Sequence, residues 1–194
     1  MKRFIKMLTV TCVAALALAA VSAAGASAAT FTASATGNLV GNATTNQVFT
    51  VGGANVVTCK KADTKGVIKS TATTEQEVTV TYTECTATFF GIPVGTVDIS
   101  PATYNFTAGT PASVHLLNAV SIKATSLGCE TIVTSGQTFS GITFTDKSGK
   151  VEQHANVTGI KSTSPNGCPS GTSGTYTGSN LTEREGGGTV GFDD

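Results

Sequence analysis

The sequence predicts an all-β protein, an antiparallel β-sandwich or its jelly-roll-like form, with two disulfides. Thr and Val, which favour pleated surfaces, are abundant, and Gly, which breaks helices, is frequent. No stretch combines a convincing 3.6-residue apolar period with helix caps. Short alternating runs instead follow one another, with turn residues between them, as in sandwiches and barrels.

The stretch 77–85 gives the clearest strand. Its apolar members alternate with threonines: Val78, Val80 and Tyr82. A period of two marks a half-buried strand. Strict alternation would put Cys85 on the threonine side. We therefore expect either a bulge near Glu84 or a strand that ends at Thr83, with Cys85 in the turn.

The other strand candidates follow along the whole chain. They are 30–35, 47–51, 55–59, 66–70, 86–90, 96–100, 102–106, 112–116, 119–124, 130–134, 141–145, 151–158 and 175–178. Several of these runs have one apolar face, and these faces should meet in one core between two sheets. Asp146-Lys147-Ser148-Gly149 predicts a hairpin turn between two of the strands.

Residues 1–29 have the features of a secretory signal peptide. A positive segment precedes an apolar run over 7–20, and Ala26-Ser27-Ala28 offers small residues for cleavage. We expect residues 30–182 to form a single β-sandwich domain. Residues 183–194 predict a Gly-rich acidic tail, either frayed or ending in a weak strand around Val190 and Phe192.

Four cysteines follow the signal peptide: Cys59, Cys85, Cys129 and Cys168. An even number in a secreted chain indicates disulfides, and order along the chain favours Cys59–Cys85 and Cys129–Cys168. Each closed loop would stabilise the fold by roughly 3.5–4 kcal/mol. No pair has the Cys-x-x-Cys spacing of a zinc site.

No familiar catalytic or phosphate-binding motif occurs, and the sequence identifies no catalytic, cofactor-binding or metal-ligating residue. Glu152 and His154 share a strand face and could give two metal ligands, but no third is visible. We interpret them as an exposed pair. His115 is interpreted as a surface or strand-edge histidine.

Paired carboxylates would serve a glycoside hydrolase, and the candidates are Glu84, Asp98, Glu130 and Glu152. Nothing in their spacing pairs them, and solvated strand faces explain them equally well. The chain has no Trp, and Tyr176 is the one tyrosine expected to be free for stacking on a sugar. Lysines 60, 61, 65 and 69 are interpreted as a solvated, edge-protecting run.

Several short motifs resemble those of a group of uncharacterised secreted β-rich proteins of actinobacteria. They are Thr58-Cys59, Thr81-Tyr82-Thr83-Glu84-Cys85, Gly128-Cys129, Gly167-Cys168 and Gly174-Thr175-Tyr176-Thr177-Gly178. The resemblance covers most of the chain after the signal peptide. It implies secretion, disulfides and an all-β fold, and it brings no activity or ligand.

We expect a secreted, non-catalytic protein with an extracellular surface, matrix or binding role. The alternatives are a polysaccharide hydrolase with paired carboxylates and a small-ligand carrier with an inter-sheet pocket. Cell-envelope or extracellular-matrix components are the expected partners. Nucleic acid is not expected, because the chain has no basic excess. No membrane span is expected after signal removal, and no cofactor is implied.

Overall fold

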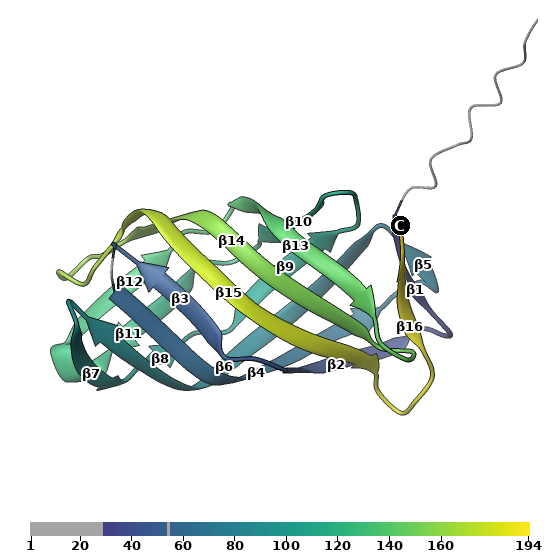
Figure 1. The fold of residues 1–194 in the computed structure, drawn as a ribbon, viewed down its shortest axis with the longest axis horizontal. Helices are drawn as coiled ribbons and strands as arrows, with labels where there is room; N and C mark the ends of the chain where they lie inside the picture. The colour runs from purple at the N-terminus through teal and green to yellow at the C-terminus, as the bar shows by residue number, and fades with distance from the viewer. Residues whose placement is uncertain (1–28, 54) are drawn as a thin grey trace, which may run out of the picture.

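The structure, a computed structural model, describes residues 29–53 and 55–194, and almost all of its regular structure is β-strand (Figure 1). The expected signal peptide lies outside the described residues, apart from Ala29. The strands are β1 (Thr30–Ala33), β2 (Gly37–Ala43), β3 (Gln47–Val51), β4 (Asn55–Ile68), β5 (Ala72–Thr73), β6 (Glu75–Phe89), β7 (Ile92–Thr96), β8 (Asp98–Ile99), β9 (Ala102–Thr107), β10 (Ala112–Leu116), β11 (Val120–Ala124), β12 (Cys129–Val133), β13 (Thr138–Asp146), β14 (Val151–Thr163), β15 (Gly171–Arg184) and β16 (Val190–Asp193). A short 3₁₀ helix, η1 (Thr125–Leu127), precedes β12.

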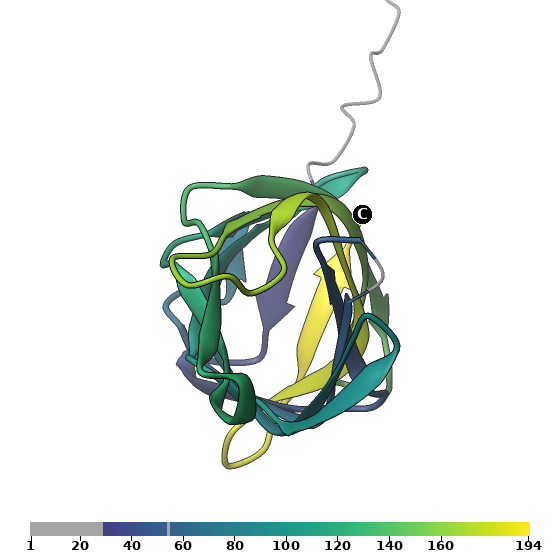
Figure 2. The ribbon, with the colours of Figure 1, turned by 90° about the vertical axis from the view of Figure 1, so that its left-hand side faces the viewer.

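A 13-stranded sheet forms the body of the molecule and closes on itself. Strands β4, β6, β9, β10, β13, β14 and β15 pair antiparallel in that order, and β15 returns to β4 through β2 and β3 (Figure 2). The expected all-β, antiparallel, sandwich-like fold is therefore confirmed. Its opposing layers are joined by continuous hydrogen bonding, so they enclose one core.

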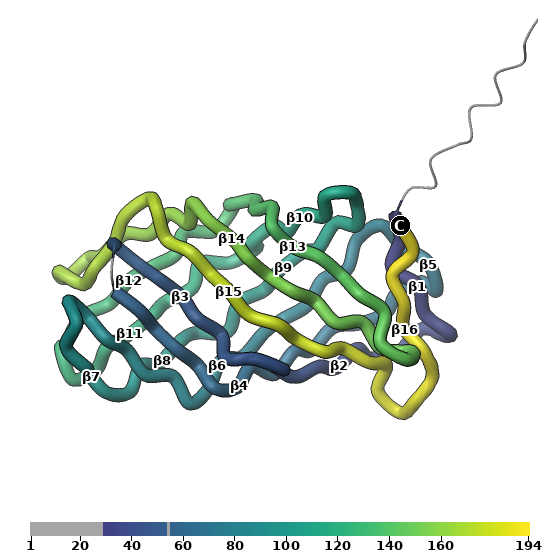
Figure 3. Tube along the Cα trace, viewed as in Figure 1, coloured from purple at the N-terminus to yellow at the C-terminus, as the bar shows by residue number. Residues whose placement is uncertain are grey.

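A separate three-stranded sheet in the order β16-β1-β5 lies across one end of the body, and we call it the cap. Strands β8, β11 and β12 extend the large sheet from β14 at the opposite end (Figure 3). There Val97 N donates to Cys85 O at 3.0 Å, which ties this extension to β6. The molecule is thus an elongated tube of strands with two different ends.

The core is built from the apolar faces that the alternation predicts. Val78, Val80 and Tyr82 of β6 are buried, as are the inward residues of β11 and of the first half of β14. The hairpin turn expected between β13 and β14 is also present. Lys147 and Lys150 exchange backbone hydrogen bonds, and Ser148 and Gly149 between them have φ of 53° and 83°. This is the two-residue loop that suits twisted hairpins.

The alternation of buried and exposed side chains is interrupted at the same place in strands β4 and β6. Cys59 and Cys85 are buried opposite one another, and so are Ala62 and Tyr82. Between these buried pairs, two successive residues of each strand face solvent, and Glu84 takes a left-handed φ of 54°. The expected irregularity near Glu84 is present, but it affects both strands together, so the pairing register is kept. The alternative, a strand that ends before Cys85, is wrong.

Both disulfide pairings predicted from the order of the cysteines are confirmed. Cys59–Cys85 links β4 to β6, and Cys129–Cys168 links the start of β12 to the segment before β15. The first bridge lies in the core, where Cys59 is fully buried. Two disulfides are consistent with an extracellular or otherwise oxidising compartment.

Several strands differ from their predicted bounds. The candidates 55–59 and 66–70 are parts of the one strand β4, and those at 77–83 and 86–90 are parts of β6. β2 was not predicted, because glycine and asparagine interrupt its apolar positions. At the C-terminus β15 runs to Arg184, and of the two expectations for the following segment the strand is present, as β16.

The cap gives a first testable prediction. Deleting residues 190–194 removes β16, and with it the buried Val190 and the ring of Phe192 that packs on Phe31 and Phe144. We expect unfolding to become easier by about 3–5 kcal/mol, because each large apolar side chain contributes roughly 1.5–3 kcal/mol when buried. Thermal unfolding and binding of a fluorescent apolar dye would measure the effect. Removing Asp194 alone is the matched control and should change neither.

Candidate functional site

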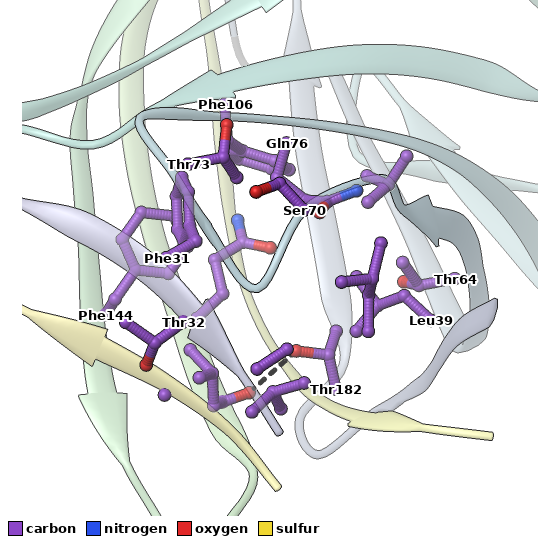
Figure 4. Close-up of a pocket in the computed structure, with 17 residues that line it drawn as sticks. Phe31, Thr32, Leu39, Thr64, Ser70, Thr73, Gln76, Phe106, Phe144 and Thr182 are labelled. Carbon is purple, nitrogen blue, oxygen red and sulfur yellow. Dashed lines mark hydrogen bonds between the residues drawn. The ribbon is translucent and has the colours of Figure 1, made fainter. Parts of the chain in front are cut away.

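A pocket lies between the cap and the large sheet, and we call it the end pocket (Figure 4). Its wall is mainly aromatic and aliphatic and includes Phe31, Leu39, Ile68, Val78, Phe106, Phe144, Val151 and Val190. None of the side chains that line it is ionisable. The cavity volume is about 50 Å³, well below the roughly 300 Å³ or more typical of sites for drug-sized ligands.

Phenylalanine rings hold the cap side of this pocket together. Phe31 of β1 meets Phe144 of β13 edge to face, with ring centroids 4.9 Å apart, and Phe106 meets Phe144 at 5.7 Å. Phe192 of β16 adds a third contact to Phe144 at 5.0 Å. Such pairs stabilise beyond their burial alone. The cap is therefore fixed to the body partly by rings that line the pocket, Phe31 and Phe144.

Two polar side chains on the pocket wall, Gln76 and Thr64, differ in whether they have hydrogen-bond partners. Gln76 donates its Nε2 to Val67 O at 3.2 Å and to Glu77 O at 2.8 Å. Thr64 of β4 is only 4% exposed, and its Oγ1 has no hydrogen-bond partner among the described residues. A buried, unpartnered hydroxyl is costly and calls for a partner such as a water or a ligand.

A layer of tyrosines separates the end pocket from the rest of the interior. Tyr82 and Tyr104 join their hydroxyls at 3.0 Å, and Tyr176 donates to Gln47 Oε1. The space between them measures about 20 Å³, and Asn180 also lines it. The expectation that Tyr176 is free for sugar stacking is wrong, because its ring lies 4.8 Å from that of Phe49 inside the tube.

Burial also changes the acidity of this layer. It raises the pKa of Tyr104 to about 12, although the hydrogen bond to Tyr82 acts in the opposite direction. The pKa values of Tyr82 and Tyr176 are likewise raised well above the usual range, chiefly because burial penalises the phenolate.

The tyrosine layer predicts how the protein responds to alkali. These three are the only tyrosines of the chain, so the native protein should show little phenolate absorbance at pH 10, where an exposed tyrosine is about half ionised. Because folding raises their pKa, stability is complete below about pH 10 and decreases as the pH rises towards 12. Ultraviolet titration of native and denatured protein would measure this. A native ionisation step near pH 10 would contradict the buried layer.

The four carboxylates proposed for a hydrolase do not form one groove. Glu84 pairs with Lys61 on the outer face of β4 and β6, and this partner lowers the pKa of Glu84 by hydrogen bonding and by charge. Asp98 and Glu130 lie on either side of Lys123, in β8 and β12, two strand spacings or about 10 Å apart. Lys123 Nζ is 3.8 Å from Glu130 Oε1, so Lys123 and Glu130 form an ion pair.

Glu152 and His154 do lie together, and a serine joins them. His154 Nδ1 is 2.8 Å from Ser179 Oγ on the neighbouring strand β15, and its Nε2 is 3.3 Å from Glu152 Oε2. Glu152 also faces Lys147 at 3.5 Å. Among the described residues no three His, Cys, Asp or Glu side chains gather to hold a metal ion. The serine contact could not be predicted, since it depends on the register of β14 with β15.

The remaining polar candidates belong to the outer surface of the sheet. His115 lies half-buried on β10, which is paired on both sides, and its Nδ1 is 2.9 Å from Thr138 Oγ1. The lysines of β4 are exposed. Lys65 protects no sheet edge, because β4 is paired there with β2 and with β6, whereas Lys60 and Lys61 lie between the stretches of β4 that pair with β3 and β2.

The end opposite the cap exposes large apolar side chains, and we call Phe90, Ile92 and Leu127 the apolar tip. Their exposed fractions are 80%, 66% and 52%. Phe90 lies in the turn between β6 and β7, and Ile92 begins β7. The helix η1 is held beside β7 because Ser126 Oγ donates to Val94 O at 2.6 Å. The sequence analysis missed the tip, because it treated 86–90 as an ordinary strand.

Few ionisable residues lie near the tip. The segments 86–97, 124–128 and 162–173 contain no Asp, Glu, Lys, Arg or His. All three segments lie at the end opposite the cap (Figure 1). Three charged residues do lie close by: Asp98 Oδ2 is 3.4 Å from Thr125 Oγ1 of η1, and Lys123 is paired with Glu130 on the adjoining strands β11 and β12.

Comparison with known proteins adds no relative. No family model matches the chain, and neither a curated protein nor a solved structure matches it. Within the part of the chain that the structure describes, no helix has the length and apolar character needed to cross a bilayer.

Proposed function

We propose that the protein is a secreted, non-catalytic binding protein that attaches to uncharged lipid of the cell envelope through its apolar tip. The observation that supports this most strongly is the conformation of Phe90. This residue is 80% exposed and takes a left-handed φ of 52°. Neither property benefits the fold, and strain retained at an exposed position points to a functional use.

The geometry of the turn that carries Phe90 gives further support. Phe89 pairs with Ile92, so Phe90 and Gly91 form a two-residue hairpin loop, and both have positive φ. Such a loop strongly prefers Asn-Gly, because Asn tolerates the left-handed region. Phe at the first position costs about 1 kcal/mol or more relative to a suited residue. The cost is understandable if the ring is buried against a target.

An uncharged lipid surface fits this end better than a folded protein partner. The tip is a protruding hairpin flanked by Gly, Pro, Ser, Thr and Asn, without the Arg or Tyr anchors typical of protein interfaces. Small hydroxyl and amide groups can hydrogen-bond to lipid head groups, while Phe and Ile enter the acyl region. The tip residues carry no charge, and Lys123 nearby is paired with Glu130, so attraction to anionic lipid is not the main force.

The expected contact is weak and reversible. Burying Phe90 and Ile92 would contribute roughly 2 kcal/mol each. The sum corresponds to a dissociation constant of about 1 mM, so several copies on one surface would be needed for stable attachment.

Secretion and the lack of catalysis belong to the same proposal. The features of residues 1–29 and the two disulfides support export from the cell. Glu152, His154 and Ser179 are adjacent, but they lie on the outer face of β14 and β15, where Ser179 is 7% exposed. The backbone N–H of Ser179 is not free to stabilise an oxyanion, because it donates to the side chain of Thr45.

The substitution Phe90→Asn tests the proposal directly. It should raise the melting temperature, because Asn suits the left-handed position, and it should weaken binding to phosphatidylcholine vesicles about tenfold or more. Co-sedimentation with vesicles and calorimetry would measure the two effects. The matched control is Ser148→Asn, which occupies the same position in the β13–β14 turn beside the cap. It should add stability and leave vesicle binding unchanged.

Salt provides a second measurement. Binding should be nearly the same at about 0.1 M and about 1 M NaCl, because the side chains of the tip are uncharged. Absence of vesicle binding by the unaltered protein, or equal binding by Phe90→Asn, would refute attachment through the tip. Attachment only to a protein component of the envelope would equally refute the choice of lipid.

A further inference from the structure

The end pocket is a second site, at the opposite end from the apolar tip. We propose that it binds a small, uncharged, mostly apolar molecule with one hydrogen-bonding group, which meets the hydroxyl of Thr64. The proposal does not depend on the tip, since the two sites share no residue and lie at opposite ends of the tube.

The lining determines the charge class of the ligand. No ionisable side chain faces the pocket, so a charged group would lose its hydration there without gaining a partner. Aromatic rings from β1, β9 and β13 line the pocket together with aliphatic side chains (Figure 4). An apolar body is therefore favoured, and a carboxylate or ammonium is rejected.

The single polar requirement comes from Thr64. Its side chain lines the pocket and is 4% exposed, and its Oγ1 lacks a hydrogen-bond partner among the described residues. The amide of Gln76, also on the wall, already donates to two backbone carbonyls. Among the described polar side chains of the wall, Thr64 is the one that is buried and lacks a partner, and it can serve as donor or acceptor.

Volume limits the size of the molecule. The cavity measures about 50 Å³, while one water needs roughly 10–15 Å³ on the same kind of measure and a cavity of about 150 Å³ holds benzene. The closed pocket therefore accepts a few heavy atoms, such as a short-chain alcohol or the end of a larger molecule. Ser70 and Thr32 on the lining are at the surface side, where the rest of a larger ligand would emerge.

The probes are xenon, which tests the apolar cavity, and 1-butanol, which adds a hydroxyl. Both should shift the backbone amide resonances of Leu39, Thr64 and Val190 in the full-length secreted protein. The variant Thr64→Val keeps the shape of the side chain and removes its hydroxyl. It should keep xenon binding and weaken 1-butanol binding about fivefold to tenfold, as expected for one lost hydrogen bond.

A cavity-filling variant and the tip variant complete the design. Ala33→Leu places a larger side chain on the pocket wall and should abolish the response to both probes, while Phe90→Asn should leave it unchanged. A pocket that holds only water would give no xenon response, and that result would overturn the proposal. Equal 1-butanol affinity in Thr64→Val and the unaltered protein would overturn the role of the hydroxyl.

Discussion

The long pairing of β4 with β6 sets the shape of the molecule. The two strands have 14 and 15 residues, which at about 3.3 Å per residue makes each strand roughly 45–50 Å long. One end of this ladder forms the wall of the end pocket through Ile68 and Val78, and the other ends in the turn at Phe90. The remaining strands complete a tube around it, so the two candidate sites are held apart by a rigid element.

The core disulfide depends on a matched irregularity in this ladder. Alternation in β4 and β6 would place Cys59 and Cys85 outside if it continued unbroken from Ala62 and Tyr82. Each strand carries its extra solvent-facing residue opposite the other's, so both cysteines turn inward without a change of register. The left-handed Glu84, held by Lys61, is where the backbone accommodates the change.

Local patterns predicted the strands, and long-range geometry determined the sites. Alternation identified the buried faces of β6, β11 and β14, and cysteine order gave both disulfides, because these properties are set by near neighbours. Closure of the sheet depends on pairings such as β15 with β2, which join residues almost 140 positions apart, and no local signal reports them. The placement of Tyr176 followed from that closure, since a strand face that would be wet in an open sheet is interior here.

The apolar tip and Thr64 were beyond sequence reasoning for a different reason. In the sequence Phe90 looks like one more apolar residue of a strand. Its left-handed φ is seen only in the structure, where it lies in a two-residue loop. Thr64 alternates with exposed neighbours, as any threonine of a β protein would, and its missing partner is a property of the enclosed space. Both are places where the chain departs from what its fold alone would favour.

The arrangement of the cap fixes how the protein can be held. Thr30 of β1 lies directly opposite Asp193 of β16, so the first and last strands that the structure describes lie side by side at the cap. A linker or support joined to either terminus would therefore attach the molecule through its cap. Held in this way, every copy would present Phe90 outward at the far end, and the tube would act as a spacer of fixed orientation.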